Sequence, residues 1–227
     1  MEYVEVAHAD SPRGGLVLRA RADGSAGPSI IELRANGIFV MDSAEHTSEQ
    51  ALANAALALH DDPEAVLVGG LGLGFTASAV LADRRVRRCV VVEIEEALVG
   101  WMRDGTIPHG PELLAEERLT VVVADIAVAV AEARPARYDL VLLDVDNGPG
   151  YLVHETNAAI YEPPFLAEVQ RILRPGGALV VWSADRSPAL EDALGALFGN
   201  ADTTAYDVDL QGRSEQYWLH TATVLGL

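Results

Sequence analysis

The chain has 227 residues, half of them hydrophobic, which is enough to bury the core of one α/β domain and argues against disorder over most of its length. With 34 acidic against 16 basic residues the formal charge is −18, so the chain repels phosphate backbones and nucleic acid is not expected as a partner. Cys89 is the single cysteine, which excludes an intramolecular disulfide and a cysteine-based zinc site.

The N-terminal residues lack the basic start and apolar run of a signal peptide, and charges or glycines interrupt every apolar stretch before it reaches membrane-spanning length. We therefore expect a cytoplasmic protein with no membrane partner. Residues 1 to about 45 are predicted to form β structure, because apolar and polar residues alternate in 16–21 and 30–34. Asn36-Gly37 lies between apolar runs, which is the strongest short-range signal for a β-hairpin.

An alanine-rich helix is predicted to follow over residues 48–60, with Thr47 or Ser48 as its N-terminal cap. Asp61-Asp62-Pro63 ends that helix and marks the boundary of the main domain. The chain is therefore divided into an N-terminal β-hairpin and helix, residues 1–62, and a main domain, residues 63–227.

In the main domain, short apolar strands alternate with helical segments. Strands are predicted at 65–68, 88–93, 119–123, 139–143 and 178–182, and helices near 75–83, 95–103, 126–133, 158–173 and 188–198. Continuous apolar strands separated by helices predict a parallel sheet with helices on both faces. Because 203–209 and 216–224 resemble a closing antiparallel pair, the fold class is α/β: a Rossmann-like, doubly wound, mostly parallel seven-stranded sheet with a small N-terminal β-hairpin segment.

Ligands of such sheets bind outside the carboxyl ends of the strands, and four successive strands here bring glycines or a carboxylate to that edge. The first strand leads into Gly70-Leu71-Gly72-Leu73-Gly74, whose glycines permit a sharp turn and the close approach of a ligand to the backbone. The dinucleotide fingerprint G-x-G-x-x-G fails, because Phe75 stands at its third glycine. A purely structural turn is the alternative explanation of this loop.

Two carboxylates at the next strand ends fit a nucleoside. Glu93 closes the second strand, where a carboxylate can accept hydrogen bonds from both ribose hydroxyls; a solvated strand-end acid is the alternative. Asp125 follows the third strand and could accept from an adenine amino group, although it is also a good N-cap for the next helix. The predicted cofactor site consists of Gly70, Gly72, Leu73, Gly74, Glu93, Ile94, Asp125 and Ile126.

The fourth strand ends in a compact acidic site, Asp144 and Asp146, followed by a Gly148-Pro149 loop. Like charges this close push one pKa upward, which suits a general base, so both aspartates are candidate catalytic residues. For Asp146, a turn in which the side chain bonds its own backbone is an equal alternative. Asp-x-Asp could also hold Mg²⁺, but no phosphate-binding lysine accompanies the pair, so this stays a minor alternative and no metal is expected there.

Three further side chains, Tyr151, His154 and Tyr161, lie on the long segment that follows the acidic site. Loops in such a position often carry specificity, so these residues could form a lid or an acceptor pocket. The N-terminal hairpin is of a kind that often pairs across a dimer, which leaves a homodimer open.

The order of these parts resembles the class I S-adenosylmethionine-dependent methyltransferase fold. The resemblance rests on the glycine loop, the strands that end at Glu93 and before Asp125, and the segments 138–144 and 173–177. Within that superfamily the chain is most similar to the spermidine synthase (polyamine aminopropyltransferase) group, over roughly residues 30–185. The resemblance implies that residues 63–227 form a catalytic domain that binds S-adenosylmethionine or its decarboxylated form.

The resemblance also implies a transferase in which Asp144 accepts the proton of an attacking amine and Glu93 and Asp125 hold ribose and adenine. Its reaction would be a displacement at a carbon bonded to a sulfonium, with a small cationic or amine-bearing acceptor. Spermidine synthases carry an aspartate in the glycine loop that holds the aminopropyl amine, and Leu73 occupies that place here. Because an apolar side chain cannot neutralise a buried ammonium, methyl transfer is placed slightly ahead of aminopropyl transfer.

Two functions of other classes stay open. An NAD-dependent oxidoreductase would use the same kind of sheet, although the glycine fingerprint does not match. A non-catalytic nucleotide-binding module would keep the fold and make Asp144 dispensable. Binding of S-adenosylmethionine, its decarboxylated form or NAD distinguishes these functions.

Overall fold

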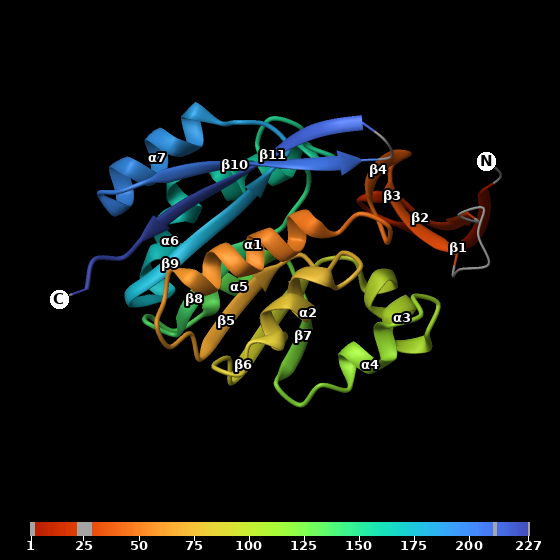
Figure 1. The fold of residues 1–227 in the computed structure, drawn as a ribbon, viewed down its shortest axis with the longest axis horizontal. Helices are drawn as coiled ribbons and strands as arrows, with labels where there is room; N and C mark the ends of the chain where they lie inside the picture. Colours follow the sequence, from red (N-terminus) through yellow and green to blue (C-terminus); the bar gives the residue numbers. More distant parts are fainter. Residues whose placement is uncertain (1–2, 22–28, 211–212, 227) are drawn as a thin grey trace.

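The computed structural model describes residues 3–21, 29–210 and 213–226, so the part of the signal-peptide prediction that rests on residues 1 and 2 lies outside them. These described residues form two sheets (Figure 1). A seven-stranded sheet flanked by helices forms the body of the molecule, and a four-stranded sheet lies beyond the carboxyl ends of its parallel strands.

The larger sheet has the strand order β10-β11-β9-β8-β5-β6-β7, and its strands pair in parallel except at β9-β11 and β11-β10. The chain runs from β5 outward to β6 and β7, then continues on the other side of β5 with β8. The change of direction therefore lies between β5 and β8, where open sheets bind ligands. The strands are β5 (Ala65–Gly69), β6 (Arg88–Glu93), β7 (Leu119–Val123), β8 (Tyr138–Leu143), β9 (Leu173–Ser183), β10 (Asp202–Leu210) and β11 (Arg213–Thr223). The predicted fold class is confirmed.

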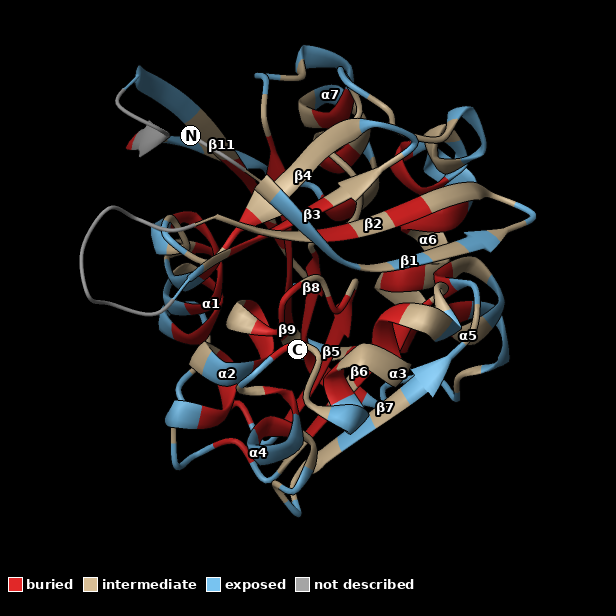
Figure 2. Ribbon diagram, turned by 90° about the vertical axis from the view of Figure 1, so that its right-hand side faces the viewer, coloured by how far each residue is buried: buried red, intermediate tan, exposed pale blue. Residues whose placement is uncertain are grey.

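Helices cover both faces of this sheet. Val66 and Val68 of β5 pack in the cluster that contains α1 and α2, while the alternate residues Ala65 and Leu67 pack in the cluster that contains α5, α6 and α7. This alternation is what a strand buried on both faces requires. Figure 2 shows the buried central strands and the largely exposed edge strand β7. The helices are α1 (Thr47–Ala58), α2 (Phe75–Ala82), α3 (Glu96–Asp104), α4 (Gly110–Leu114), α5 (Ile126–Glu132), α6 (Pro163–Ile172) and α7 (Pro188–Phe198).

The N-terminal strands form an antiparallel sheet in chain order: β1 (Tyr3–Ser11), β2 (Gly14–Arg21), β3 (Ile30–Ala35) and β4 (Ile38–Asp42). The predicted hairpin is its β3-β4 pair. Asn36 and Gly37 adopt φ angles of 51° and 77°, the left-handed backbone that a two-residue type I′ turn needs. Leu16, Leu18 and Leu33 belong to the main core, so this sheet is packed onto the body of the molecule.

Local helix predictions differ from the structure at two places. The N-cap of α1 is His46 and makes no side-chain capping hydrogen bond, whereas Thr47 donates its amide to Glu45. The single helix predicted over 158–173 is a 3₁₀ helix, Glu155–Tyr161, followed by α6. Pro163 forces the preceding Glu162 into extended backbone and so prevents one continuous helix.

Helix α1 lies on the N-terminal side of the predicted boundary but packs with the larger sheet. Leu52, Ala53 and Ala56 share a core cluster with Val68 of β5 and Val80 of α2. The division of the chain at residues 62 and 63 therefore stays a prediction, and α1 itself helps to build the body of the molecule.

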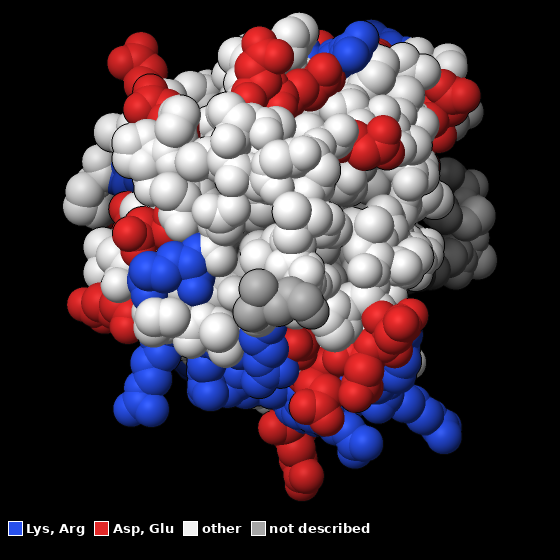
Figure 3. Space-filling model, turned by 90° about the vertical axis from the view of Figure 1, so that its left-hand side faces the viewer, with Lys and Arg blue, Asp and Glu red and all other residues white. Residues whose placement is uncertain are grey.

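Surface charge is unevenly placed. Figure 3 shows basic side chains gathered along the lower edge of the side opposite the N-terminal sheet, with acidic side chains among them. Exposed arginines include Arg84 and Arg87, which precede β6 at its amino end, away from the carboxyl edge of the sheet. Among the described residues, no helix has the length and apolarity that crossing a membrane requires.

Candidate active site

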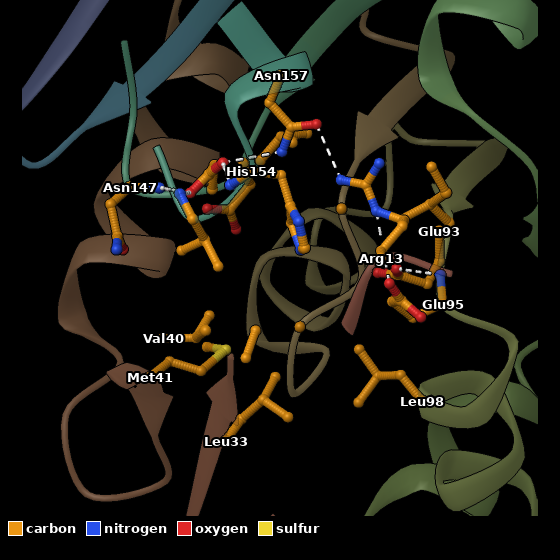
Figure 4. A pocket seen from close by; sticks show the side chains of 18 of the residues that line it. Arg13, Leu33, Val40, Met41, Glu93, Glu95, Leu98, Asn147, His154 and Asn157 are labelled. Atoms are coloured by element: carbon orange, nitrogen blue, oxygen red, sulfur yellow. Dashed lines mark hydrogen bonds and ion pairs between the residues drawn. The ribbon is translucent and has the colours of Figure 1, made fainter. Parts of the chain in front are cut away.

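A cavity of about 290 Å³ lies between the N-terminal sheet and the carboxyl ends of β5, β6, β7 and β8. β2, β3 and β4 supply one wall, the glycine loop and the strand ends supply the opposite wall, and the segment after β8 closes one side (Figure 4). Eight of the described lining residues are acidic, against one arginine: Asp42, Glu45, Glu49, Glu93, Glu95, Asp125, Asp144 and Asp146. Such a lining favours a cationic ligand over an anionic one.

The glycine loop contributes only part of its length to this cavity. Gly70 and Gly72 line it, and a Cβ at Gly70 would lie 2.1 Å from the backbone oxygen of Asp144, so only glycine fits there. Leu73 and Gly74 do not line it. The Leu73 side chain is fully buried in the core, and Gly74 adopts a φ of 85° as the N-cap of α2.

Glu93 ends β6 and is buried, facing the cavity. Its two carboxylate oxygens accept the backbone amides of Leu71 (2.9 Å) and Glu95 (2.8 Å). Burial raises the pKa of Glu93, while these amides oppose the shift. A carboxylate has about four lone-pair positions, so Glu93 keeps capacity to accept from a ligand. The adjoining Ile94 also lines the cavity.

Asp125 and Ile126 follow β7 and reach the same cavity. Asp125 is the N-cap of α5, where its Oδ1 accepts the Ala127 amide at 2.8 Å. The capping role considered from the sequence is therefore present. The residue is exposed and its other oxygen stays open to a ligand, so an adenine contact stays a prediction.

Asp144 follows β8 at the point where the sheet changes direction. The hydroxyl of Thr76, at the start of α2, donates to Asp144 Oδ2 at 2.5 Å. Burial raises the pKa of Asp144 to about 6, and the Thr76 hydrogen bond opposes this shift. A carboxylate with such a pKa can take up a proton near neutral pH, as a general base must.

Asp146 lies in the same cavity wall, but its oxygens are engaged by its own loop. It has a φ of 63°, and it accepts hydrogen bonds from the backbone amides of Asn147, Val153 and His154 and from Asn157 Nδ2. A carboxylate that holds four donors orders the segment 146–157 and keeps little capacity for a substrate proton. The turn alternative describes these contacts, and a catalytic role for Asp146 stays a prediction.

The three loop residues predicted for the acceptor pocket are placed differently. His154 lines the cavity, and burial, followed by the charge of Arg13, lowers its pKa. Tyr151 is 52% exposed and lies outside the lining. Tyr161 is buried beneath the loop, where its hydroxyl donates to the backbone oxygen of Val145. Of these three, only His154 is brought to the candidate site.

Arg13 was missed by the sequence analysis, although it spans the cavity mouth. It lies between β1 and β2, donates to Asn157 Oδ1 at 3.0 Å, and its Nε lies 3.5 Å from Glu95 Oε1 (Figure 4). It thus ties the N-terminal sheet to the loop after β8 and to the end of β6. No motif surrounds Arg13 in the sequence, so no local signal marks it.

Glu49 and Thr76 were also missed. Glu49 lies in the first turn of α1, is 7% exposed and lines the cavity. Burial and the charge of Asp144 raise the pKa of Glu49 to about 7, and a hydrogen bond from the Ser48 hydroxyl, at 2.7 Å, opposes the shift. An acidic residue in a first helical turn is ordinarily a solvated partner of the helix dipole, which hides its burial from sequence patterns.

Comparisons with known proteins identify the family of this chain. The profile of the spermine/spermidine synthase domain matches residues 45–196. The chain belongs to this family. The predicted resemblance to spermidine synthases is therefore confirmed, and the segment matched begins just before α1 and ends within α7.

Relatives with curated names include polyamine aminopropyltransferases and putrescine N-methyltransferases. Polyamine aminopropyltransferase 2 of Pseudomonas aeruginosa is 32% identical over 144 residues, which cover 62% of this chain and 39% of that protein. Polyamine aminopropyltransferase of Aeropyrum pernix is 27% identical over 165 residues (68% and 50%), and putrescine N-methyltransferase 3 of Nicotiana tabacum is 27% identical over 151 residues (63% and 38%). The chain thus spans half or less of the length of these relatives.

Solved structures show the same fold. The crystal structure of spermidine synthase from Thermotoga maritima superposes with a TM-score of 0.80 at 16% identity, covering 96% of this chain and 72% of that one. A spermidine synthase in complex with the transition state analogue AdoDATO gives a TM-score of 0.81 at 16% identity, over 96% and 73%. At this identity the likeness concerns the fold.

Proposed function

We propose that this chain transfers an aminopropyl group from decarboxylated S-adenosylmethionine to a small amine. The neutral amine nitrogen attacks the methylene carbon bonded to the sulfonium, and the new C–N bond forms as the C–S bond breaks. The electron pair of the broken bond goes to sulfur, methylthioadenosine leaves, and the proton lost by nitrogen passes to Asp144. In this reaction the protein supplies position, desolvation and a proton acceptor.

The observation that carries the proposal is the joint placement of Glu93 and Asp144 on one acidic cavity. Glu93 keeps acceptor capacity for ribose hydroxyls, and Gly70 and Gly72 leave room for a ligand beside the backbone. Asp144 is available for a proton near neutral pH. Adenine would lie against Ile94, Asp125 and Ile126 at the strand ends next to Glu93.

The transferred group in this proposal differs from the one that the sequence alone favoured, which was a methyl group. The curated polyamine aminopropyltransferases favour aminopropyl transfer, which the sequence analysis placed second. Methyl transfer was placed first on the expectation that Leu73 faces the aminopropyl chain of the donor. Because Leu73 is fully buried in the core and does not line the cavity, it places no apolar side chain against a ligand.

Methyl transfer to an amine is the second candidate. It is favoured by the match to putrescine N-methyltransferases, which are 27% identical over 151 residues. It would use the same cavity and the same proton acceptor, with S-adenosylmethionine as donor. The two candidates therefore differ in the donor and share Asp144 and Glu93.

Product analysis with each donor tests the proposal. The protein is incubated with 1,4-diaminobutane and either decarboxylated S-adenosylmethionine or S-adenosylmethionine, and mass spectrometry follows methylthioadenosine and S-adenosylhomocysteine. We expect methylthioadenosine and an aminopropylated diamine from the decarboxylated donor. Formation of S-adenosylhomocysteine and an N-methylated diamine alone contradicts aminopropyl transfer. Donor binding without either product indicates a binding module, and tight binding of NAD alone indicates an oxidoreductase.

A further inference from the structure

Glu49 differs from the other buried carboxylates of the described chain, each of which has either an arginine partner or a backbone amide of another residue on both oxygens. Glu32 pairs with Arg19 and Arg34, Asp42 with Arg21, and Asp139 with Arg174. Glu93 has no arginine, but two backbone amides hold its oxygens. A buried carboxylate without a cation is costly, so its retention calls for a ligand or another reason specific to the site.

The contacts of Glu49 leave one side of its carboxylate open to the cavity. The Ser48 hydroxyl donates to Oε2, and no ion pair of the described residues involves Glu49 or Asp144. Asp144 accepts the Thr76 hydroxyl on one oxygen. Both side chains line the same cavity, where their mutual repulsion is felt by Glu49. The pair therefore presents two negative groups that hydroxyl donors and, at Glu49, its own backbone amide contact, but that no cation of the described chain neutralises.

Aromatic side chains complete this end of the cavity. Trp182 and Tyr217 line it, with ring centroids 4.7 Å apart in an edge-on arrangement. Trp182 is 8% exposed, and its indole N–H has no hydrogen-bond partner. Aromatic rings attract alkylammonium groups, whereas they give nothing to an anion. The nucleoside carboxylate Glu93 ends β6, which β5 separates from β8 and Asp144, so the two carboxylates have different surroundings.

We propose that Glu49 is a substrate-binding residue that, together with Asp144, holds a single alkylammonium group at the aromatic end of the cavity. The inference rests on the proposed function, in which both substrates carry a primary amine: the aminopropyl chain of the donor and the acceptor itself. Glu49 supplies the negative charge that Leu73 does not, since the Leu73 side chain points into the core. A neutral group of the same shape would leave the pair unneutralised and bind less well.

Calorimetry separates the two sources of the ammonium. In the acceptor arm, 1,4-diaminobutane is titrated into protein saturated with methylthioadenosine. In the donor arm, decarboxylated S-adenosylmethionine is compared with methylthioadenosine, which lacks the aminopropyl group. Glu49→Gln is expected to weaken binding in at least one arm by about tenfold or more, as for a lost charge-assisted hydrogen bond, and to leave methylthioadenosine within about twofold. The arm that responds identifies the source.

Glu96→Gln is the matched control, because Glu96 lies in the first turn of α3 as Glu49 does in that of α1, but is exposed and does not line the cavity. It is expected to change either affinity by less than about threefold, as for an exposed charge. Equal losses in Glu96→Gln and Glu49→Gln, equal losses for methylthioadenosine, or no loss in either arm would overturn the assignment.

A second readout keeps the test decisive where Glu49→Gln does not fold. An ammonium that binds between protonated carboxylates expels protons, so the binding heat of the wild-type protein near pH 6.5 should depend on the ionisation heat of the buffer. Glu49→Asp should reduce this release, and absence of any release in the wild-type protein contradicts the proposal. Failure of the proposed function looks different: no aminopropylated product, but amine binding that still depends on Glu49.

Discussion

Glu32 of the N-terminal sheet and the two cavity acids Glu49 and Asp144 have opposite electrostatic surroundings. In the sheet, Glu32 is 1% exposed and its Oε1 lies 2.6 Å from Arg19 Nη2 and 2.9 Å from Arg34 Nη1. In the cavity, Glu49 and Asp144 accept hydrogen bonds from the hydroxyls of Ser48 and Thr76, and neither forms an ion pair with a described residue. Glu32 is neutralised by two arginines of the chain itself, as a structural role requires. Glu49 and Asp144 have no such partner among the described residues, and we propose that the substrate supplies their cation. An arginine partner thus distinguishes a structural carboxylate from one that is proposed to bind substrate.

The largest expected effect is on catalysis through Asp144. Asp144→Asn keeps the shape and the Thr76 contact but removes the proton acceptor, so kcat for aminopropyl transfer should fall by about 10²–10⁴-fold. Methylthioadenosine affinity, measured by calorimetry, should stay within about threefold because Glu93 and the glycine loop are untouched. Full turnover in this variant would show that Asp144 is not the proton acceptor of the reaction.

Removing the sheet acid should destabilise the protein. Glu32→Gln leaves Arg19 and Arg34, each less than one third exposed, without their shared carboxylate, which should lower the free energy of unfolding by about 1–3 kcal/mol at pH 7.5. Urea unfolding followed by circular dichroism measures it. The affinity of the cavity for amines should not change. A selective loss of that affinity would contradict a purely structural role for Glu32.

Removing Glu49 from the cavity should raise the free energy of unfolding rather than lower it. Burial, followed by the charge of Asp144, raises the pKa of Glu49 from 4.5 to about 7. A raised pKa means that the folded state binds more protons than the unfolded state, so the stabilising contribution is complete below pH 4.5 and is lost as the pH rises through about 7. Glu49→Gln should therefore be more stable than the wild-type protein by about 1–3 kcal/mol at pH 8, and equally stable near pH 4.5.

The measurement is urea unfolding of both proteins across this pH range. The ionisable groups that face Glu49 are Glu45 from the preceding turn, Asp144 from the end of β8 and Tyr217 from β11. Glu45→Gln serves as the control and should shift the curve little. A Glu49→Gln variant that is less stable at pH 8 would assign Glu49 to the structural class of acids.

The smallest expected effect concerns Arg13, which joins the two regions. Arg13→Ala removes the contacts to Asn157 and Glu95, both partly exposed to solvent, so the cost in stability should be within about 1 kcal/mol. KM for the donor should rise by about three- to tenfold with little change in kcat, because closure of the cavity is weakened rather than its chemistry. Steady-state kinetics decides, and an equal fall in kcat would assign Arg13 to the reacting groups.

Much of the fold could be predicted because its signals are local. Apolar runs bounded by glycine or charge mark the strands, and Asn36-Gly37 marks the hairpin. Glu93 and Asp144 could be placed at one edge of the sheet from the sequence, because the carboxyl ends of parallel strands meet there whatever the details of packing. The break between the 3₁₀ helix and α6 was missed, although Pro163 is a local signal for it.

The rest of the site depends on contacts between distant parts of the chain. Thr76 and Asp144 are 68 residues apart, and Arg13 and Asn157 are 144 apart. Leu73 is a further example. Its place in the glycine loop suggested a ligand contact, whereas its side chain is buried in the core. A motif gives the position of a residue along the loop, but the direction of its side chain follows from how α2 and the core pack.

The sequence by itself determined the α/β architecture, the resemblance to the spermidine synthase family, and the strand ends that carry Glu93 and Asp144. Only the tertiary structure decided that Glu49 joins Asp144, that the oxygens of Asp146 are taken up by its own loop, and that Leu73 turns away. The reason is physical. Periodicity and turn chemistry act along neighbouring residues, whereas desolvation and charge pairing are set by whichever elements fold against one another.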